Sequence, residues 1–238
     1  MSILYLIVWQ IVAHILTDFI AQNDKDVDEK RVNGLKGKFF KHHILIALGL
    51  SWLMSFQLRF FFYALVIAVI HGALDVLKRY VEKRSRWVTI AFFADQILHI
   101  ITIVAVVYAF QSIEGLAHGL YDYLSLRHSI IITAYLICLK PANVFIKETF
   151  RAFNITIPNN EKQGEDLPHA GKLIGIVERM LVLTFVLLNQ YEAVGFLIAA
   201  KSILRFKEDE RIKSEYVLIG TMLSFGIAIG LGIIPRFL

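Results

Sequence analysis

Three long, mostly apolar runs restrict what this chain can fold into more than any other feature of its sequence. They cover Ser2–Ile20, Phe60–Leu77 and Val88–Phe110, and each is close to the roughly 20 residues that an α-helix needs to cross a bilayer. Hydrophobic residues make up 57% of the 238 residues, which is more than a soluble domain of this length needs for its core. A membrane β-barrel would instead show short alternating segments. The sequence therefore predicts an all-α fold, a polytopic transmembrane helical bundle.

Apolar segments separated by polar connections suggest seven to eight membrane segments. We expect them at residues 2–20, 43–56, 60–77, 88–110, 129–147, 172–189, 191–204 and 215–234. Segments 43–56 and 191–204 are short, which leaves open whether they span fully, tilt or re-enter. The polar stretch 151–170, with its prolines and Gly164, is typical of a linker. We therefore predict a first transmembrane module over residues 1–150, a cytoplasmic linker over 151–170 and a second transmembrane module over 171–238.

Lysine and arginine are concentrated in alternate loops. The connections at residues 24–41, 78–86 and 205–213 are rich in basic residues, whereas those between them carry few. The positive-inside rule then places the N-terminus outside and the basic loops in the cytoplasm, as in a multi-pass protein of a bacterial inner membrane. Topology thus explains the formal net charge of +5 without nucleic acid as a partner. Membrane lipid is the expected partner, and assembly into a homo-oligomer is left open.

Three apolar segments carry a histidine and an aspartate four residues apart. The pairs are His14 with Asp18, His71 with Asp75, and Asp95 with His99. This spacing puts both side chains of a pair on one helix face, and the predicted topology places the three pairs at similar depth in the cytoplasmic half. Imidazole and carboxylate are ligands for zinc, manganese or iron, and helix bundles can build metal sites from inward-facing residues. The six residues are therefore candidate ligands for one or two divalent metals.

Other polar residues are candidates for supporting roles. Gln96, His43 and Lys78 lie near the three pairs and are candidates to orient substrate or shuttle protons, and Glu178 is a further catalytic candidate. In the second module we expect Glu178 to pair with Lys201 or Arg205. Cations left over, from among Arg179, Lys201 and Arg205, would then bind an anionic headgroup.

The arrangement of these residues resembles a bacterial membrane-protein family catalogued only as a domain of unknown function. The resemblance rests on His14-x3-Asp18-Phe-x2-Gln22, Lys36 ahead of His43, His71-x3-Asp75-x2-Lys78, Asp95-Gln96-x2-His99, Gly175-x2-Glu178-Arg179, Lys201-Ser202-x2-Arg205 and Glu215-Tyr216-x2-Ile219-Gly220-Thr221. It extends over nearly the whole chain and implies that these polar positions belong together. It implies no activity.

Three functions are compatible with the sequence. The first is a metal-dependent hydrolase that acts on a lipid-linked phosphate or ester at a cytoplasm-facing intramembrane site. The second is a proton- or cation-coupled transporter or channel that uses the same histidines and aspartates, since ionisable residues within a membrane commonly mark ion pathways. The third is a non-catalytic membrane scaffold, in which the polar residues only hold the helices together.

Overall fold

The computed structural model describes residues 3–22, 37–82, 88–115, 125–155, 170–205 and 211–238. Within these ranges the chain forms helices and short helical turns and no strand, which confirms the predicted all-α fold. It divides into two compact units, Met1–Thr133 and Ala134–Leu238. This division falls inside a helix, ahead of the predicted linker at 151–170, most of which lies outside the described residues, as do Lys36 and most of the basic loops. The module boundaries of the sequence analysis therefore stay a prediction.

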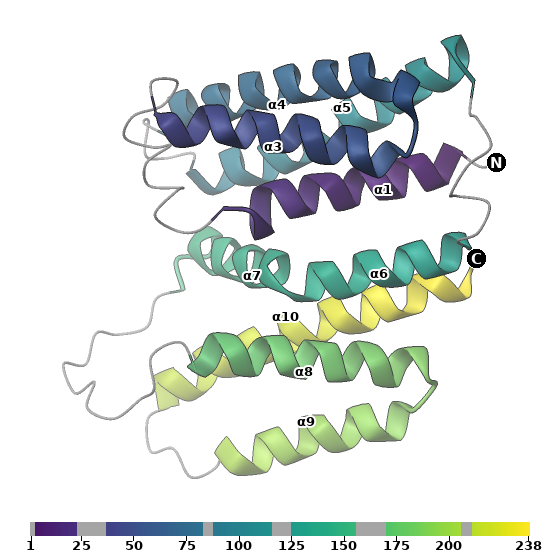
Figure 1. Ribbon diagram of the computed structural model, residues 1–238. Coiled ribbons are helices and arrows are strands. Elements are labelled where there is room, and N and C mark those ends of the chain that lie inside the picture. Colours follow the sequence, from purple (N-terminus) through teal and green to yellow (C-terminus); the bar gives the residue numbers. More distant parts are fainter. Residues whose placement is uncertain (1–2, 23–36, 83–87, 116–124, 156–169, 206–210) are drawn as a thin grey trace. The chain divides into compact units, whose positions relative to one another are not determined.

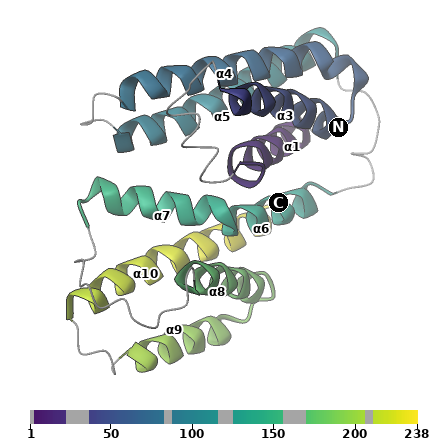
Figure 2. The same cartoon turned by 60° about the vertical axis from the view of Figure 1, so that its left-hand side comes forward.

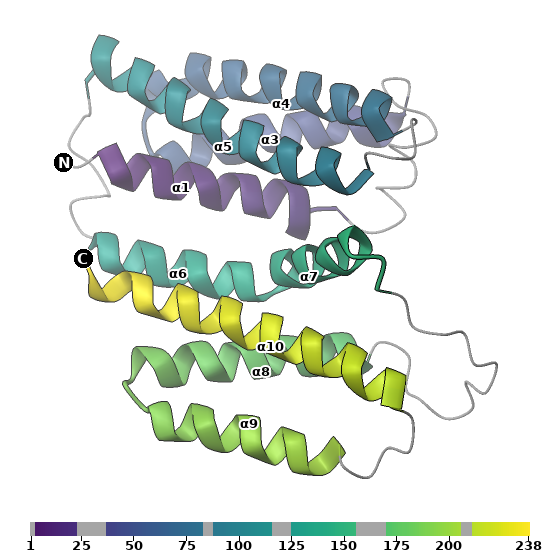
Figure 3. The same cartoon turned by 180° about the vertical axis from the view of Figure 1, so that it is seen from behind.

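The first unit is a bundle of four long helices. They are α1 (Ile3–Ile15), which continues as the π-helical turn η1 (Leu16–Ile20), α3 (Lys38–Ser55), α4 (Phe61–Glu82), preceded by the 3₁₀ turn η3 (Leu58–Phe60), and α5 (Val88–Ile113). Successive helices run in opposite directions (Figures 1 and 3). Helix α1 packs against α3 and α5, and α4 packs against the same two. The four helices therefore close into a ring with a common interior.

One half of this interior is apolar. Phe60, Phe110 and Leu6 are fully buried there, and the Phe110 ring meets the rings of Phe60 and Tyr63 edge to face at centroid distances of 5.0 Å. Such aromatic pairs are worth about 0.5–1.5 kcal/mol each beyond the area that they bury. The inward face of α4 continues from this layer through Ile67 to His71 at helical spacing. The polar residues are consequently gathered in the other half of the bundle.

The second unit contains the end of α6 (Leu126–Cys138), α7 (Lys140–Ala152), α8 (Ala170–Leu187), α9 (Tyr191–Arg205), α10 (Arg211–Ile233) and the 3₁₀ turn η5 (Ile234–Arg236). Helix α10 lies against α8 and α7 (Figure 2). The single segment predicted at 129–147 is instead two helices, α6 and α7, which meet at an angle of 52°. The break lies at Leu139, just before Pro141, because proline lacks the amide hydrogen that would continue α6 and is favoured in the first turn of a new helix.

Four helical segments among the described residues are long and apolar enough to cross a membrane: Ile3–Ile20, Leu58–Glu82, Val88–Ile113 and Glu215–Arg236. The bent pair of α6 and α7 makes five if it counts as one span. Large apolar side chains such as Phe62 (72% exposed) and Leu45 (63%) point away from the interior of the first unit, as expected for helices in contact with lipid. These features indicate a membrane protein, with four to five spans by this criterion rather than the predicted seven to eight.

Candidate metal centre

The three predicted His/Asp pairs come together inside the first unit. Helix α1 with η1 supplies His14 and Asp18, α4 supplies His71 and Asp75, and α5 supplies Asp95 and His99. His43 of α3, expected from the sequence only as a neighbour, lies among them and is completely buried. The side chains of the two aspartates Asp18 and Asp75 are each 8% exposed. All four helices of the bundle therefore contribute a ligand-type side chain to one buried group.

Two imidazole nitrogens of this group, His43 Nε2 and His71 Nε2, lie close to each other and to one oxygen each of Asp18 (Oδ1) and Asp75 (Oδ2). The two imidazole nitrogens are 2.9 Å apart. Asp18 Oδ1 lies 3.5 Å from the nitrogen of His43 and 3.2 Å from that of His71. Asp75 Oδ2 lies 3.5 Å and 3.9 Å from the same two nitrogens. We refer to these four residues as the tetrad.

Five of the six edges of the tetrad have lengths near those of a tetrahedral metal site. Zinc–nitrogen and zinc–oxygen bonds of about 2.0–2.1 Å place the ligand atoms of a regular tetrahedron about 3.3–3.4 Å apart. The five distances within the tetrad, 2.9–3.9 Å, bracket that value. Asp18 Oδ1 is buried and has no hydrogen-bond partner among the described residues, which is costly for a carboxylate unless a cation balances it. Both observations fit a divalent metal bound between the four side chains.

The π-helical turn η1 positions Asp18. In this turn the amide of Ala21 donates to the carbonyl of Leu16, five residues earlier, at 2.8 Å. The side chain of Gln22 donates to the carbonyl of Asp18. The widened turn changes the direction of Asp18 relative to a regular α-helix, and π-helical turns are frequent at functional sites. The four-residue spacing of His14 and Asp18 predicts a regular α-helix here, so the sequence did not indicate the π-helical turn.

A chain of hydrogen bonds links the remaining residues of the group. Gln96 Nε2 donates to Asp95 Oδ2 at 3.1 Å, and Lys78 Nζ donates to the same oxygen at 3.0 Å. Because the amide nitrogen of Gln96 faces the carboxylate, its oxygen is the acceptor towards His14 Nε2, 3.3 Å away. His14 therefore carries its hydrogen on Nε2, and its Nδ1 lone pair faces Asp18 Oδ2 at 3.9 Å. The structure thus joins the predicted supporting residues Gln96 and Lys78 to the centre.

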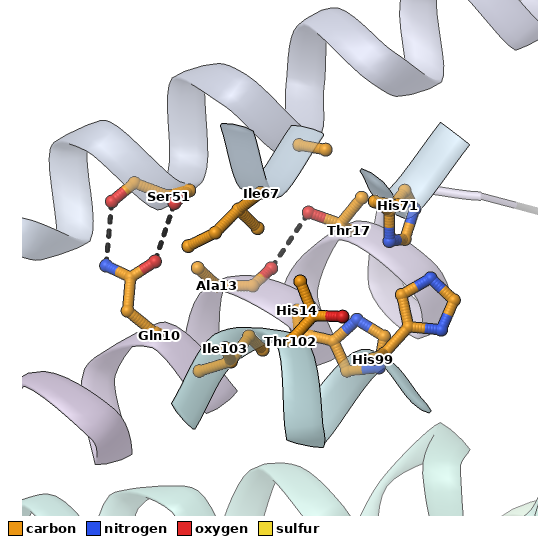
Figure 4. Close-up of a pocket in the computed structure, with 11 residues that line it drawn as sticks. Gln10, Ala13, His14, Thr17, Ser51, Ile67, His71, His99, Thr102 and Ile103 are labelled. Atoms are coloured by element: carbon orange, nitrogen blue, oxygen red, sulfur yellow. Dashed lines mark hydrogen bonds between the residues drawn. The ribbon is translucent and has the colours of Figure 1, made fainter. Parts of the chain in front are cut away.

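A small cavity borders the centre on its apolar side (Figure 4). It has a volume of about 20 Å³, enough for a water molecule, and His14, His71 and His99 line one part of it. At its other end Gln10 of α1 donates to the carbonyl of Ser51 at 2.8 Å and accepts from the Ser51 hydroxyl at 2.6 Å. Gln10 is 1% exposed. Neither residue of this pair belongs to a recognisable motif, so the sequence did not indicate it.

The candidates of the second module form local contacts within the second unit. Glu178 and Lys201 form the predicted ion pair. Arg179, expected at an anionic headgroup, is 1% exposed and donates to the carbonyls of Cys138 and Leu139 and to two side chains, Asn143 and Ser224. It thereby satisfies carbonyls that the break after α6 leaves without helical partners. The side chain of Arg205 lies outside the described residues.

The residues that match a known family are those of the bundle that holds the centre. Residues 6–122 match the model of a family described as a protein of unknown function (DUF3307). This part of the chain is a DUF3307 domain. The tetrad and its neighbours all belong to the DUF3307 domain, whereas the second-module motifs around Glu178, Lys201 and Glu215 lie beyond the matched residues. No curated protein and no solved structure was found to match the chain.

Proposed function

We propose that the DUF3307 domain of this chain binds a divalent transition metal through the tetrad. The observation that carries the proposal is the set of five ligand-to-ligand distances, which are close to five of the six edges of a tetrahedral site. Zinc, manganese and iron all accept imidazole and carboxylate ligands. Formal charge also supports a divalent ion. With neutral imidazoles, the three carboxylates Asp18, Asp75 and Asp95 and the one ammonium of Lys78 leave −2.

The proposed setting is a multi-pass protein of a bacterial inner membrane with its N-terminus outside. The alternation of basic loops along the sequence supports this orientation. It puts the centre in the cytoplasmic half of the bundle, because Asp18, Asp75 and Asp95 lie towards the helix ends that connect to the basic loops at 24–41 and 78–86. Substrate would then approach from the inner leaflet.

The reaction that this centre suits best is hydrolysis of a lipid-linked phosphate or ester. A bound metal would polarise a phosphoryl or carbonyl oxygen and lower the pKa of a coordinated water. The side chain of Lys78 is 23% exposed, whereas that of its partner Asp95 is 3% exposed. The hydrogen-bond chain that begins at His14 therefore ends at a partly exposed cation, which can bind an anionic substrate. Gln96 holds His14 and Asp95 in place through its two hydrogen bonds.

Metal analysis of the purified protein tests the proposal. We expect at least one equivalent of zinc, manganese or iron per chain in detergent, and we expect His43→Ala to lose it. The matched control is His42→Ala, because His42 is exposed on the same helix turn. Wild-type protein that binds no metal even after incubation with these ions would refute the metal centre. If metal binds but phosphate is not released from a lipid monophosphate in mixed micelles, the hydrolase assignment fails and the centre stands.

The cavity favours a cation or proton pathway as the second candidate. It extends from the imidazoles towards Gln10 and Ser51, which place polar groups deep in the otherwise apolar half of the bundle. Polar side chains around internal water are typical of relays through membranes. Proteoliposomes that contain the protein would then show proton or metal flux, and Gln10→Leu would abolish it. Equal flux with and without the protein would remove this candidate.

A further inference from the structure

His99 carries a buried lone pair that the tetrad does not use. Its Nδ1 donates to the backbone carbonyl of Asp95 at 2.8 Å, which fixes the neutral tautomer with its hydrogen on Nδ1. Nε2 is then an acceptor, and it is buried with no hydrogen-bond partner among the described residues. His99 itself is 3% exposed. Metal-ligating histidines are commonly oriented in this way, with the second ring nitrogen held by a carbonyl.

Asp95 offers a second unused atom beside it. Its Oδ2 accepts from both Lys78 and Gln96, whereas Oδ1 is buried and has no hydrogen-bond partner in the part of the chain that the structure describes. Ligand-type atoms of Asp75, Asp95 and His99 all lie within 4.8 Å of one another. This group therefore contains one carboxylate oxygen and one imidazole nitrogen that have no hydrogen-bond partner among the described residues.

Asp75 connects this group to the tetrad. It belongs to the group of His43 and His71 through Oδ2, and it also belongs to the group of Asp95 and His99. A carboxylate has two oxygens and can bind one metal with each, as in the di-metal carboxylate sites of helix bundles. The two metal-binding groups thus share one ligand.

We infer that the DUF3307 domain holds two metal ions, the first in the tetrad and the second between Asp95 and His99, with Asp75 as the bridging ligand. The inference rests on the proposed metal function. One divalent ion already balances the formal charge of −2 in the group, so a second ion binds to a centre that is no longer negative. The second ion consequently binds more weakly than the first. It also leaves the centre with a net positive charge, which favours an anionic ligand. Paired metals of this kind clamp both the attacking and the leaving oxygen in phosphate-ester hydrolysis.

Titration of metal-free protein with Mn²⁺, followed by electron paramagnetic resonance and elemental analysis, tests the inference. We expect two equivalents per chain, with an isolated-ion spectrum after the first and a spin-coupled spectrum after the second. His99→Ala should bind one equivalent and show only the isolated-ion spectrum. The matched control is His128→Ala, because His128 is an exposed histidine at the start of α6. Asp95→Asn, which keeps the size of the side chain, should also bind one equivalent and replaces His99→Ala if that variant does not fold.

The outcomes separate this inference from the proposed function. A single equivalent in both wild type and His99→Ala would overturn the second site and leave the tetrad standing. Two equivalents in wild type and in both variants would also overturn it, because the second ion would then lie elsewhere. No bound Mn²⁺ in wild type, together with no zinc or iron, would refute the metal centre itself.

Discussion

Replacing Asp18 by asparagine should change stability in opposite directions with and without metal. When no metal is bound, Asp18 Oδ1 is a buried acceptor 3.2 Å and 3.5 Å from two imidazole nitrogens. Those nitrogens share one hydrogen bond with each other, so two neutral imidazoles have no further Nε2 hydrogen to give the carboxylate. A buried charged acceptor without donors costs about 1–3 kcal/mol or more. We therefore expect metal-free Asp18→Asn to be more stable than wild type by about 1–3 kcal/mol.

Metal should reverse this order. A ligand at 100 times its dissociation constant stabilises the folded state by about 2.7 kcal/mol, and wild type should gain this amount while Asp18→Asn, which lacks a charged ligand, gains much less. Thermal unfolding in detergent, with a chelator or with added Zn²⁺, measures both states. Each kcal/mol corresponds to about 2–4 °C for a chain of this size. The matched control is Glu114→Gln, an exposed acidic residue at the end of α5, which should shift stability by less than about 0.5 kcal/mol.

The opposite result would refute the reasoning. If the tetrad were a closed structural network, as the scaffold hypothesis requires, Asp18 would pair with a charged imidazole. Asp18→Asn would then break a buried ion pair and destabilise the metal-free protein by about 3–5 kcal/mol. Added metal would leave both proteins unchanged.

Three further predictions concern residues around the centre and in the second unit. Gln10→Ala should lower the free energy of unfolding by about 1–3 kcal/mol, because it removes both hydrogen bonds to Ser51 and leaves the buried Ser51 hydroxyl without its acceptor. A double-mutant cycle with Ser51→Ala should show coupling between the two residues. Arg179→Met should destabilise the protein by about 3 kcal/mol or more through loss of four hydrogen bonds, yet leave binding to anionic vesicles unchanged in a flotation assay. Gly232→Ala should cost about 1–3 kcal/mol by thermal unfolding, because its Cβ would lie 2.6 Å from Val186 Cγ1, whereas Gly226→Ala meets nothing within 4 Å and should not destabilise.

The convergence of the His/Asp pairs followed from spacing and from the expected directions of the helices. His71 with Asp75 and Asp95 with His99 lie on regular helices, so the four-residue spacing does place each pair on one face. A neighbouring pair on an antiparallel helix then meets it at the same depth. His43 joins the group because it lies in the first two turns of α3, at the end of the bundle where α1 ends.

Other features depend on contacts that are distant in sequence. The partner of Gln10 lies 41 residues away, and only the packing of α1 on α3 reveals it. A cation within an apolar helix, such as Arg179, can bind either an external anionic ligand or a backbone carbonyl inside the protein. Arg179 binds carbonyls because the helix break after Cys138 leaves them available. Pro141 was a signal for that break, since a proline inside an apolar segment commonly ends or kinks a helix. The sequence did not predict that the four helices pack in a ring, because that packing depends on contacts between residues far apart in the chain.

The π-helical turn η1 makes the centre sensitive to chain length as well as to side-chain chemistry. The bond from Ala21 to Leu16 encloses one residue more than an α-helical turn does. Deleting one residue between Leu16 and the aspartate would convert this turn to a regular helical one. Asp18 would then rotate by about 100° and shift by about 1.5 Å along the axis, away from His43 and His71. A substitution of Thr17 keeps the carboxylate in register, whereas deletion of Thr17 moves Asp18 out of the centre although every ligand residue is still present.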